Sequence, residues 1–143
     1  MKVEPYLFFN GQCEEAIEFY KQTLGAKVLM ALRFRDNPDK PGPYKVAPDL
    51  DDKIMHASLK IGETEVLMSD GMGTGRPEFK GITLALGVQS EAEADRVFNA
   101  LAEGGQIKMP IGKTFFSPRF GGVADRFGVS WIIVTAQQAA QKA

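Results

Sequence analysis

Hydrophobic and polar positions predict the same order of elements twice along this chain. An apolar, aromatic run over residues 3–10 is typical of a buried strand. Residues 13–24 then carry apolar side chains at helical spacing, and Gly25 provides a natural end for that helix. A strand over residues 27–35 follows, so the pattern begins as strand, helix and strand.

The next two strands are predicted to form a hairpin whose first strand has two chemically different faces. Residues 54–61 and 65–69 form the strands, joined by a turn about Gly62 and Glu63. One face of the first strand is apolar throughout, and we expect it to contact the helix. The other face is mixed and carries His56, so it should line whatever cavity the sheet forms.

A second copy of this pattern occupies the rest of the chain. A strand over residues 81–89 precedes a helix over 90–103, and Ser90 with Glu93 forms a capping box at the start of that helix. Gly128 lies before the last strand, at the point that Gly62 occupies in the first copy. The remaining strands are predicted at 106–111, 119–124 and 129–135.

The duplication predicts an α+β fold of two βαβββ modules whose sheets curl into a half-barrel. We expect residues 1–143 to form a single domain of two repeats, about 1–70 and 80–135, with a glycine-rich join and a short C-terminal tail. A concave surface would then need both modules. It could be supplied within one chain or across a homodimer, the commonest symmetric assembly.

The segment over residues 36–53 interrupts this pattern. It is polar and contains four prolines, so it is neither a central strand nor a helix interior. Irregular segments of this length are usually functional or disordered. Two interpretations stay open, a surface excursion and a lid or arm that contacts a second chain.

Composition limits the classes of partner. The 17 basic and 18 acidic residues give a formal net charge of −1, and a surface without a basic face argues against a nucleic-acid partner. No run approaches the roughly 20 apolar residues of a membrane helix, so we expect no membrane partner. The one cysteine cannot form an intrachain disulfide, and the N-terminus lacks a signal-like apolar run. The default prediction is a cytoplasmic location.

His56 is the only histidine and the main candidate for chemistry. An imidazole titrates near neutral pH, so His56 could act as a general base or as a polar anchor for a ligand. The alternative is a partly buried histidine satisfied by a neighbouring group. Without a second histidine, no metal site built from several histidines can form.

A small-molecule pocket is predicted from apolar side chains closed by a few polar groups. Met68, Phe116 and Trp131 would supply the apolar surface, while Asp70 and Arg119 would lie at the rim. The same apolar residues at strand spacing can equally belong to the core. The predicted ligand pocket consists of His56, Met68, Asp70, Phe116, Arg119 and Trp131.

Cys13 begins the first predicted helix, where the helix dipole can lower the pKa of a thiol. Glu14 and Glu15 follow it directly and would oppose a thiolate. We therefore expect Cys13 to be a small buried residue at the helix entry rather than a nucleophile.

Several short motifs, taken in order, resemble the glyoxalase/bleomycin-resistance superfamily, also called vicinal oxygen chelate. Within it the chain is similar to the PhnB-like group, often labelled 3-demethylubiquinone methyltransferase-like. Phe116-Ser117 departs from that group, which commonly shows Trp-Gly. The motifs are Pro5-Tyr6-Leu7, Phe9-Asn10-Gly11, Phe19-Tyr20 with Leu24-Gly25, His56-Ala57-Ser58-Leu59, Leu67-Met68-Ser69-Asp70 and Phe127-Gly128-Val129-Ser130-Trp131.

The resemblance implies a divalent ion held by His, Glu or Gln from four strands in metal-dependent members. Those positions fall on Pro5, Val66, Thr83 and Ile132 here. Met68 would replace Val66 if the register of that strand slips by two. None of these side chains suits a hard or borderline cation. Neighbouring Glu65 would serve only after a one-residue slip that turns its strand over.

The residues thus predict a metal-free small-molecule binding protein with no cofactor, acting as a homodimer. The alternative is an enzyme, either metal-dependent or using His56 or an acid for proton transfer, of lyase, isomerase or dioxygenase type. The methyltransferase label fits poorly, because the turn after the first strand has only Gly11 and the sheet is not doubly wound.

Overall fold

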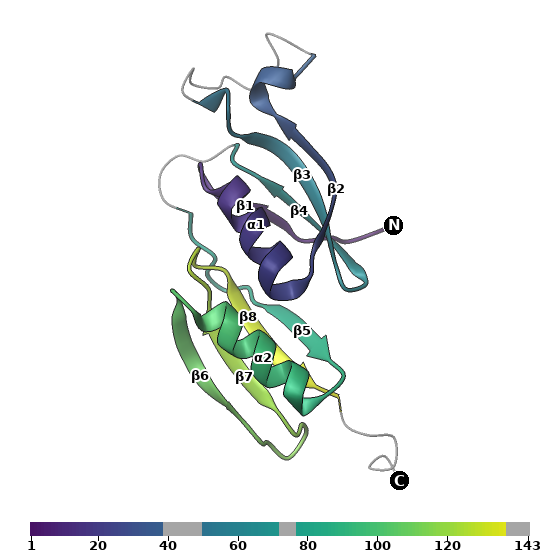
Figure 1. Ribbon diagram of the computed structural model, residues 1–143, viewed down its shortest axis with the longest axis vertical. Helices are drawn as coiled ribbons and strands as arrows, with labels where there is room; N and C mark the ends of the chain where they lie inside the picture. The colour runs from purple at the N-terminus through teal and green to yellow at the C-terminus, as the bar shows by residue number, and fades with distance from the viewer. Residues whose placement is uncertain (39–49, 72–76, 137–143) are drawn as a thin grey trace. The chain divides into compact units, whose positions relative to one another are not determined.

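The computed structural model describes residues 1–38, 50–71 and 77–136 (Figure 1). Its contacts group the chain into two compact units, Met1–Pro77 and Glu78–Ala143. Most of the proline-rich segment, the glycine-rich join and the C-terminal tail lie outside the described residues, so their predicted roles stay predictions. Within the described ranges, no helix is both long and apolar enough to cross a membrane.

The first unit contains one helix and a four-stranded mixed sheet. The strands lie in the order β1-β4-β3-β2, with β1 parallel to β4 and the other neighbours antiparallel. A short 3-10 turn, η1 (Phe34–Asp36), follows the edge strand. The elements are β1 (Tyr6–Phe8), α1 (Cys13–Leu24), β2 (Lys27–Arg33), β3 (Ile54–Ile61) and β4 (Thr64–Ser69).

The second unit repeats this plan, with strand order β5-β8-β7-β6 and the parallel pair again formed by the first and last strands. The predicted pair of βαβββ modules is therefore confirmed. Neither sheet closes into a barrel within the described residues. The elements are β5 (Leu84–Val88), α2 (Glu91–Ala102), β6 (Gln106–Gly112), β7 (Phe120–Ala124) and β8 (Ser130–Thr135).

Helix α1 has the predicted bounds, and its end follows from a left-handed glycine. Gly25 has φ 66°, and its N–H donates to the carbonyl of Lys21 at 3.1 Å. This bond from the residue after the helix to the carbonyl of C3 is the αL motif, and the N–H of Ala26 donates further back, to the carbonyl of Tyr20 at 3.2 Å. The helix buries Cys13, Ala16, Ile17, Phe19 and Tyr20.

Helix α2 begins at the predicted cap. The Ser90 hydroxyl accepts from the Glu93 N–H at 3.1 Å, while the Glu93 carboxylate accepts from the Gln89 N–H at 3.0 Å. The helix packs closely on β7 because Gly121 has no side chain there. A Cβ at that position would lie 2.8 Å from the Cα of Ile111 on β6 and 2.8 Å from a ring carbon of Phe98 on α2, so a larger residue would force these neighbours apart.

The carboxylate of Asp70 joins the start of α1 to the start of β3. Its Oδ1 accepts from the N–H groups of Gly11 at 2.6 Å and Cys13 at 2.9 Å, and its Oδ2 accepts from the N–H of Ile54 at 3.0 Å. The residue is only 1% exposed. Since Gln12 offers no side-chain cap, Asp70 caps α1 from a distant part of the chain.

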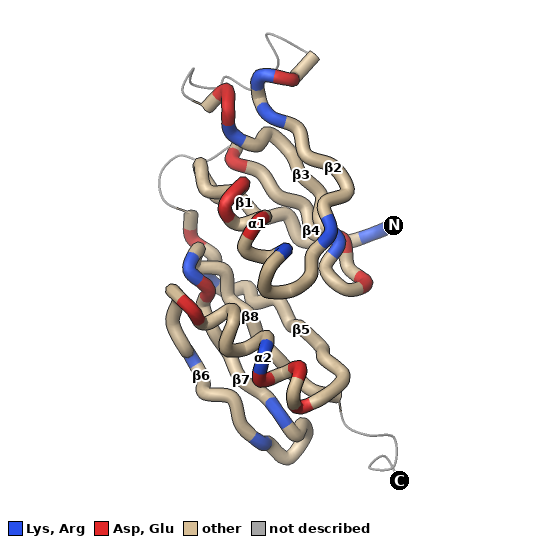
Figure 2. Tube along the Cα trace, viewed as in Figure 1, with Lys and Arg blue, Asp and Glu red and all other residues tan. Residues whose placement is uncertain are grey.

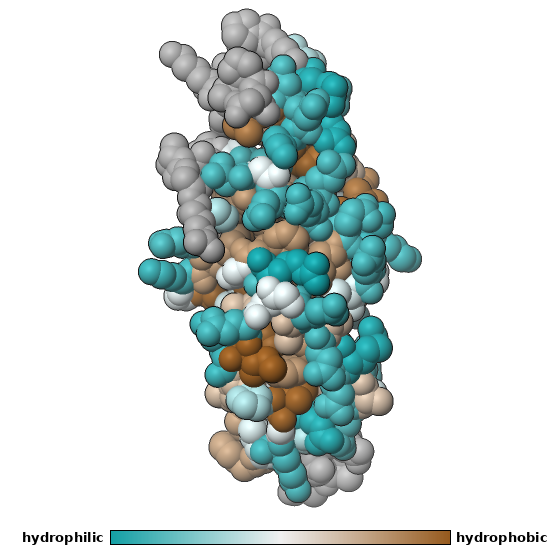
Figure 3. Space-filling model, turned by 60° about the vertical axis from the view of Figure 1, so that its left-hand side comes forward, coloured by the Kyte–Doolittle hydropathy of each residue, from teal (hydrophilic) through white to brown (hydrophobic). Residues whose placement is uncertain are grey.

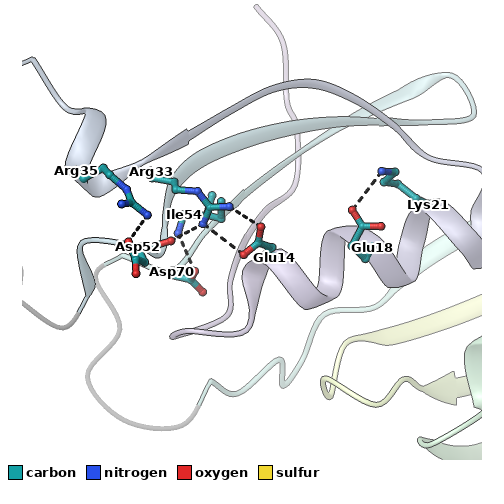
Figure 4. A network of polar contacts seen from close by, with 8 residues as sticks. All are labelled: Glu14, Glu18, Lys21, Arg33, Arg35, Asp52, Ile54 and Asp70. Atoms are coloured by element: carbon teal, nitrogen blue, oxygen red, sulfur yellow. Dashed lines mark hydrogen bonds and ion pairs between the residues drawn. The ribbon is translucent and has the colours of Figure 1, made fainter.

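Exposed ion pairs surround this buried carboxylate (Figure 4). Arg33 binds the Glu14 carboxylate through both its terminal nitrogens, and Arg35 pairs with Asp52. The hydrogen bond from Arg33 lowers the pKa of Glu14. Such exposed pairs contribute little to stability, because water screens the charges. Figure 2 shows residues of both charge signs along the backbone of each unit.

Replacing Asp70 should destabilise the protein far more than replacing an exposed acid. Asp70→Ala removes the acceptor for three N–H groups, and each buried unsatisfied donor costs about 1–3 kcal/mol. We expect a loss of about 3 kcal/mol or more in the free energy of unfolding, measured by urea denaturation. Asp70→Asn keeps one oxygen and should lose less. Glu63→Gln, at the exposed hairpin turn, is the control; equal losses for Ala and the control would contradict the capping role.

Candidate functional site

The sheet of the first unit has one buried face and one open face. Side chains alternate along each strand, and the register aligns Tyr6 with Leu67 and Leu67 with Ser58 on one side. The opposite, helix-facing side is buried and carries Leu7, Ala57, Leu59, Val66 and Met68. We call the first side the open face; it carries Tyr6, Phe8, Met30, Leu32, His56, Ser58, Lys60, Glu65 and Leu67.

Aromatic side chains of β1 are exposed on the open face. Tyr6 is 41% exposed and Phe8 37% exposed. Their rings stack with centroids 4.8 Å apart and planes 5° from parallel. Exposed, ordered aromatic surface of this kind usually marks an interaction site.

His56 lies beside this stack, on β3. Its Nδ1 is 2.8 Å from the hydroxyl of Tyr6, and the two rings are tilted by 58° at 5.5 Å. His56 thus lies on the mixed face of its strand and has a polar neighbour, which leaves open both the ligand-anchoring role and the alternative of a histidine satisfied by its neighbour. Leu32 is the partner of His56 on β2, so the imidazole has an apolar neighbour on that side.

A second polar pair lies further along the open face. The Ser58 hydroxyl donates to the Glu65 carboxylate at 2.7 Å, and the ammonium of Lys2 is 3.9 Å from the other carboxylate oxygen. Ser58 is 3% exposed, so this hydrogen bond satisfies a buried hydroxyl. Two polar pairs of the open face, Tyr6 with His56 and Ser58 with Glu65, are thus formed before any ligand arrives.

Two predicted pocket residues of the first unit lie away from the open face. Met68 is fully buried on the helix-facing side, where it pairs with Ala57 and Leu7. Asp70 is the buried cap of α1 described above. Of the three predicted residues in this unit, only His56 reaches the open face, because Met68 follows Leu67 by one residue and therefore points the other way.

The three predicted residues of the second unit have different surroundings. Trp131 is a core residue, 3% exposed, whose indole N–H donates to Asp125 at 2.9 Å. Arg119 binds Glu91 at 3.0 Å and Asp95 at 3.2 Å on α2. Phe116 is 41% exposed and makes edge-to-face contacts with Phe115 and Phe120. These three residues do not form one cluster of side chains in the contacts that the structure shows.

The register of β4 corrects the assignment of Val66 to a metal-ligand position. Val66 is 4% exposed and points toward the helix side, whereas Ile132 of β8 lies on the other side of its own sheet. Val66 and Ile132 lie on different sides of their sheets because the two connections differ in length. The β3–β4 turn consists of Gly62 and Glu63, whereas the β7–β8 connection consists of residues 125–129. Glu65 therefore faces the open side without any slip.

The described residues contain no group of three or more His, Cys, Asp or Glu side chains placed to hold a metal ion. On the open face the candidate donors are His56 and Glu65. Each of them already contacts a protein group, Tyr6 and Ser58 respectively. A catalytic divalent ion generally takes about three protein ligands, and this set falls short of that number.

Cys13 is fully buried at the start of α1. Burial raises the pKa of its thiol strongly, and the negative charges of Asp70 and Glu14 raise it further. The thiol therefore stays protonated at neutral pH, which is the opposite of what a nucleophilic cysteine needs. This agrees with its predicted structural role.

Sequence reasoning missed Tyr6, Phe8 and Glu65 as members of the open face. The alternation of β1 contained the signal for the two aromatic residues, since Leu7 is buried between them. The signal for Glu65 lay in the short turn after β3. A two-residue turn fixes the pairing of Lys60 with Glu65 and so places Glu65 on the same side as Ser58.

Comparisons with known proteins agree with this architecture. The family model for 3-demethylubiquinone-9 3-methyltransferase matches residues 1–134. The protein YjdN of Escherichia coli K12 is 38% identical over 149 residues, covering 96% of this chain and 97% of that protein. The crystal structure of protein PA1353 from Pseudomonas aeruginosa is 42% identical with a TM-score of 0.84, over 96% of this chain and 99% of that one.

Two further solved structures connect the chain to its group and its superfamily. A putative 3-demethylubiquinone-9 3-methyltransferase, PhnB protein, from Bacillus cereus is 30% identical with a TM-score of 0.77, over 95% and 100% of the two chains. A glyoxylase/bleomycin resistance protein/dioxygenase domain from Frankia sp. EAN1pec shares the fold at 15% identity, with a TM-score of 0.66 over 94% of each chain. The chain therefore belongs to the PhnB-like, 3-demethylubiquinone-9 3-methyltransferase family, whose fold is that of the glyoxalase/bleomycin-resistance superfamily.

Proposed function

We propose that this protein binds a small molecule without a resident metal ion, and that the open face of the first unit forms the binding surface. The observation that carries the proposal is the exposed Tyr6–Phe8 stack next to the hydrogen-bonded pair of Tyr6 and His56. Small-molecule sites combine apolar and aromatic surface with a few placed polar groups, and the open face has this composition.

The apolar surface favours a ligand with a planar ring. A ring packed against an aromatic side chain gains about 0.5–1.5 kcal/mol beyond the burial of its area. Met30, 44% exposed, and half-buried Leu67 extend the apolar surface around the stack. Ligand binding would remove these side chains from water, which supplies the main driving force.

The donor set supports binding without a metal ion. His56 and Glu65 are the two open-face side chains that could ligate a divalent cation, and Tyr6 and Ser58 already engage them. A ligand that approaches the open face would therefore meet preformed hydrogen-bonded pairs rather than a ring of free donors.

The family description names a methyltransferase, and we do not extend that activity to this chain. Sites for adenosine-containing methyl donors lie at a glycine-rich turn on a parallel, doubly wound sheet. Here the turn between β1 and α1 contains Gly11 alone, and its N–H is bound to Asp70. The turn that would have to cradle such a donor is thus already used to cap the helix.

A proton-transfer enzyme is the second candidate, because Tyr6 orients the imidazole of His56. An oriented imidazole is the commonest general acid or base in enzymes. The two candidates differ in one respect that an experiment can measure. An enzyme consumes its ligand and loses turnover in His56→Ala while binding persists, whereas a binding protein returns the ligand unchanged.

Ligand binding should depend on the exposed aromatic residues of the open face. A thermal-shift screen against quinones, aromatic antibiotics and phosphonates should give at least one compound that raises the melting temperature, since a ligand at a hundred times its Kd adds about 2.7 kcal/mol. Phe8→Ala should weaken that compound roughly tenfold or more, measured by calorimetry, through lost ring contact.

Phe115→Ala is the matched control, because it removes another exposed phenylalanine, 96% exposed, from the second unit. Equal losses of affinity in both variants, or no loss in Phe8→Ala, would contradict binding at the open face. The recovered compound is then analysed by mass spectrometry, which separates the binding protein from the enzyme.

The absence of a resident metal ion is tested by equilibrium dialysis against Ni²⁺, Mn²⁺ and Zn²⁺, followed by elemental analysis. We expect less than stoichiometric metal in each case, because the open face offers two candidate side-chain ligands rather than about three. His56→Ala provides the comparison for weak surface binding. One tightly held ion per chain that disappears in His56→Ala would overturn the metal-free proposal.

A homodimer in the cytoplasm completes the proposal. Large hydrophobic side chains are exposed on the edge strands of both units, and Figure 3 shows hydrophobic surface between polar side chains on one side of the molecule. Symmetric pairing of two chains is the commonest way to cover such surface. The exposed residues of these edge strands are Val28, Leu29 and Met30 on β2, and Ile107 and Met109 on β6.

Light scattering coupled to gel filtration should therefore give twice the mass of one chain. Leu29→Lys places a charge on the exposed edge strand β2. If β2 lies in the dimer interface, this variant should shift the monomer–dimer equilibrium toward the monomer. Lys21→Ala on the exposed side of α1 is the control. The mass of one chain across micromolar concentrations would disprove the dimer.

A further inference from the structure

The hydrogen bond between Tyr6 and His56 determines which nitrogen the imidazole presents to a ligand. The hydroxyl of Tyr6 is 2.8 Å from Nδ1 of His56. No hydrogen bond to Nε2 is found among the residues that the structure describes. The two ring nitrogens are distinct, and the hydrogen bond made by one fixes the protonation of the other. Whether Nε2 donates or accepts a hydrogen bond therefore depends on whether the Tyr6 hydroxyl donates to Nδ1 or accepts from it.

Three protonation states are compatible with this geometry. In the neutral ring the tyrosine hydroxyl either donates to an unprotonated Nδ1, which leaves the proton on Nε2, or accepts from Nδ1–H, which leaves Nε2 bare. In the imidazolium both nitrogens carry protons, and the hydroxyl accepts. Nε2–H is a donor in two of these three states. Since a phenol donates a hydrogen bond more readily than it accepts one, the neutral ring favours the first state.

In the part of the chain that the structure describes, no acceptor is hydrogen-bonded to Nε2 of His56. On β2 its register partner is Leu32, and on β1 its contact is Tyr6. On β4 the open face carries Leu67, while the carboxylate of Glu65 is bound by Ser58 and lies near Lys2. Glu65 is thus engaged by Ser58 and Lys2, and its register partner Lys60 also lies on this side of the sheet.

We propose that Tyr6 holds His56 as the Nε2–H tautomer, and that the open face therefore selects planar aromatic ligands that carry a carbonyl or carboxylate oxygen. The inference rests on the proposed binding function of this face and adds the class of ligand. The ring packs on the Tyr6–Phe8 stack, and the oxygen accepts from Nε2–H of His56. Tyr6 is a positioning residue in this arrangement, since it acts through the histidine.

The tautomer is measured without any ligand. Because His56 is the only histidine, long-range ¹H–¹⁵N correlation spectra of the labelled protein show one imidazole, with no assignment needed. In the neutral ring we expect a protonated Nε2 and an unprotonated Nδ1. Tyr6→Phe should move both nitrogen shifts toward the values of a mixed population. A protonated Nδ1 with a bare Nε2 in the unmodified protein would overturn the proposal.

Ligand selection is tested with a pair of probes of the same shape, measured by calorimetry. The first is 2-acetylnaphthalene, and the second is its analogue in which a methylene group replaces the carbonyl oxygen. A hydrogen bond of about 1 kcal/mol predicts that the ketone binds roughly fivefold more tightly. His56→Phe keeps a flat ring without a donor and should abolish the difference, while His56→Gln keeps an N–H donor and should retain part of it.

The outcomes separate this inference from the function on which it rests. If neither probe binds and Phe8→Ala changes nothing, the open face does not bind aromatic molecules and both proposals fall. If both probes bind equally and Phe8→Ala weakens both, the binding function stands and the selection by His56 is wrong. A difference between probes that persists in His56→Phe would also disprove the role of the histidine.

Discussion

The buried carboxylate of Asp70 is the constraint on which the first unit depends. It accepts from three N–H groups that belong to the turn before α1, the first residue of α1 and the first residue of β3. A carboxylate without a countercharge is stable in the interior only when hydrogen bonds satisfy it in this way. Asp70 thereby ties the helix to one side of the sheet and sets which side remains open.

The open face follows from that attachment. With α1 held over one side, the alternation of each strand sends Leu7, Ala57 and Met68 to the core and their neighbours outward. Tyr6 and His56 are such neighbours, on β1 and β3, and they meet at 2.8 Å although fifty residues separate them. The chemistry of the face is thus a consequence of the register rather than of any local motif.

Periodicity in the sequence was sufficient to predict both helices, both sheets and the side of β3 that carries His56. It was insufficient where the outcome depends on turn length or on a distant partner. The family resemblance gave Val66 and Ile132 as matching positions of the two copies, but the unequal turns place them on opposite sides of their sheets. Asp70 was expected at a pocket rim, because nothing nearby in sequence shows that its partners lie 16 and 57 residues away.

The two modules share their helix-facing side and differ on the other side. Helix contact demands bulky apolar residues in both, and Trp131 and Ile133 in β8 are buried as Val66 and Met68 are in β4. The opposite side of the second sheet carries Ala85, Gly87 and Gly122 beside Phe120, Ile132 and Val134, and it has no histidine. Packing against a helix thus constrains one side of each repeat, and the other side was free to acquire different chemistry. The Tyr6–His56 pair therefore belongs to one copy alone, and the duplication explains the scaffold of the site but not its specificity.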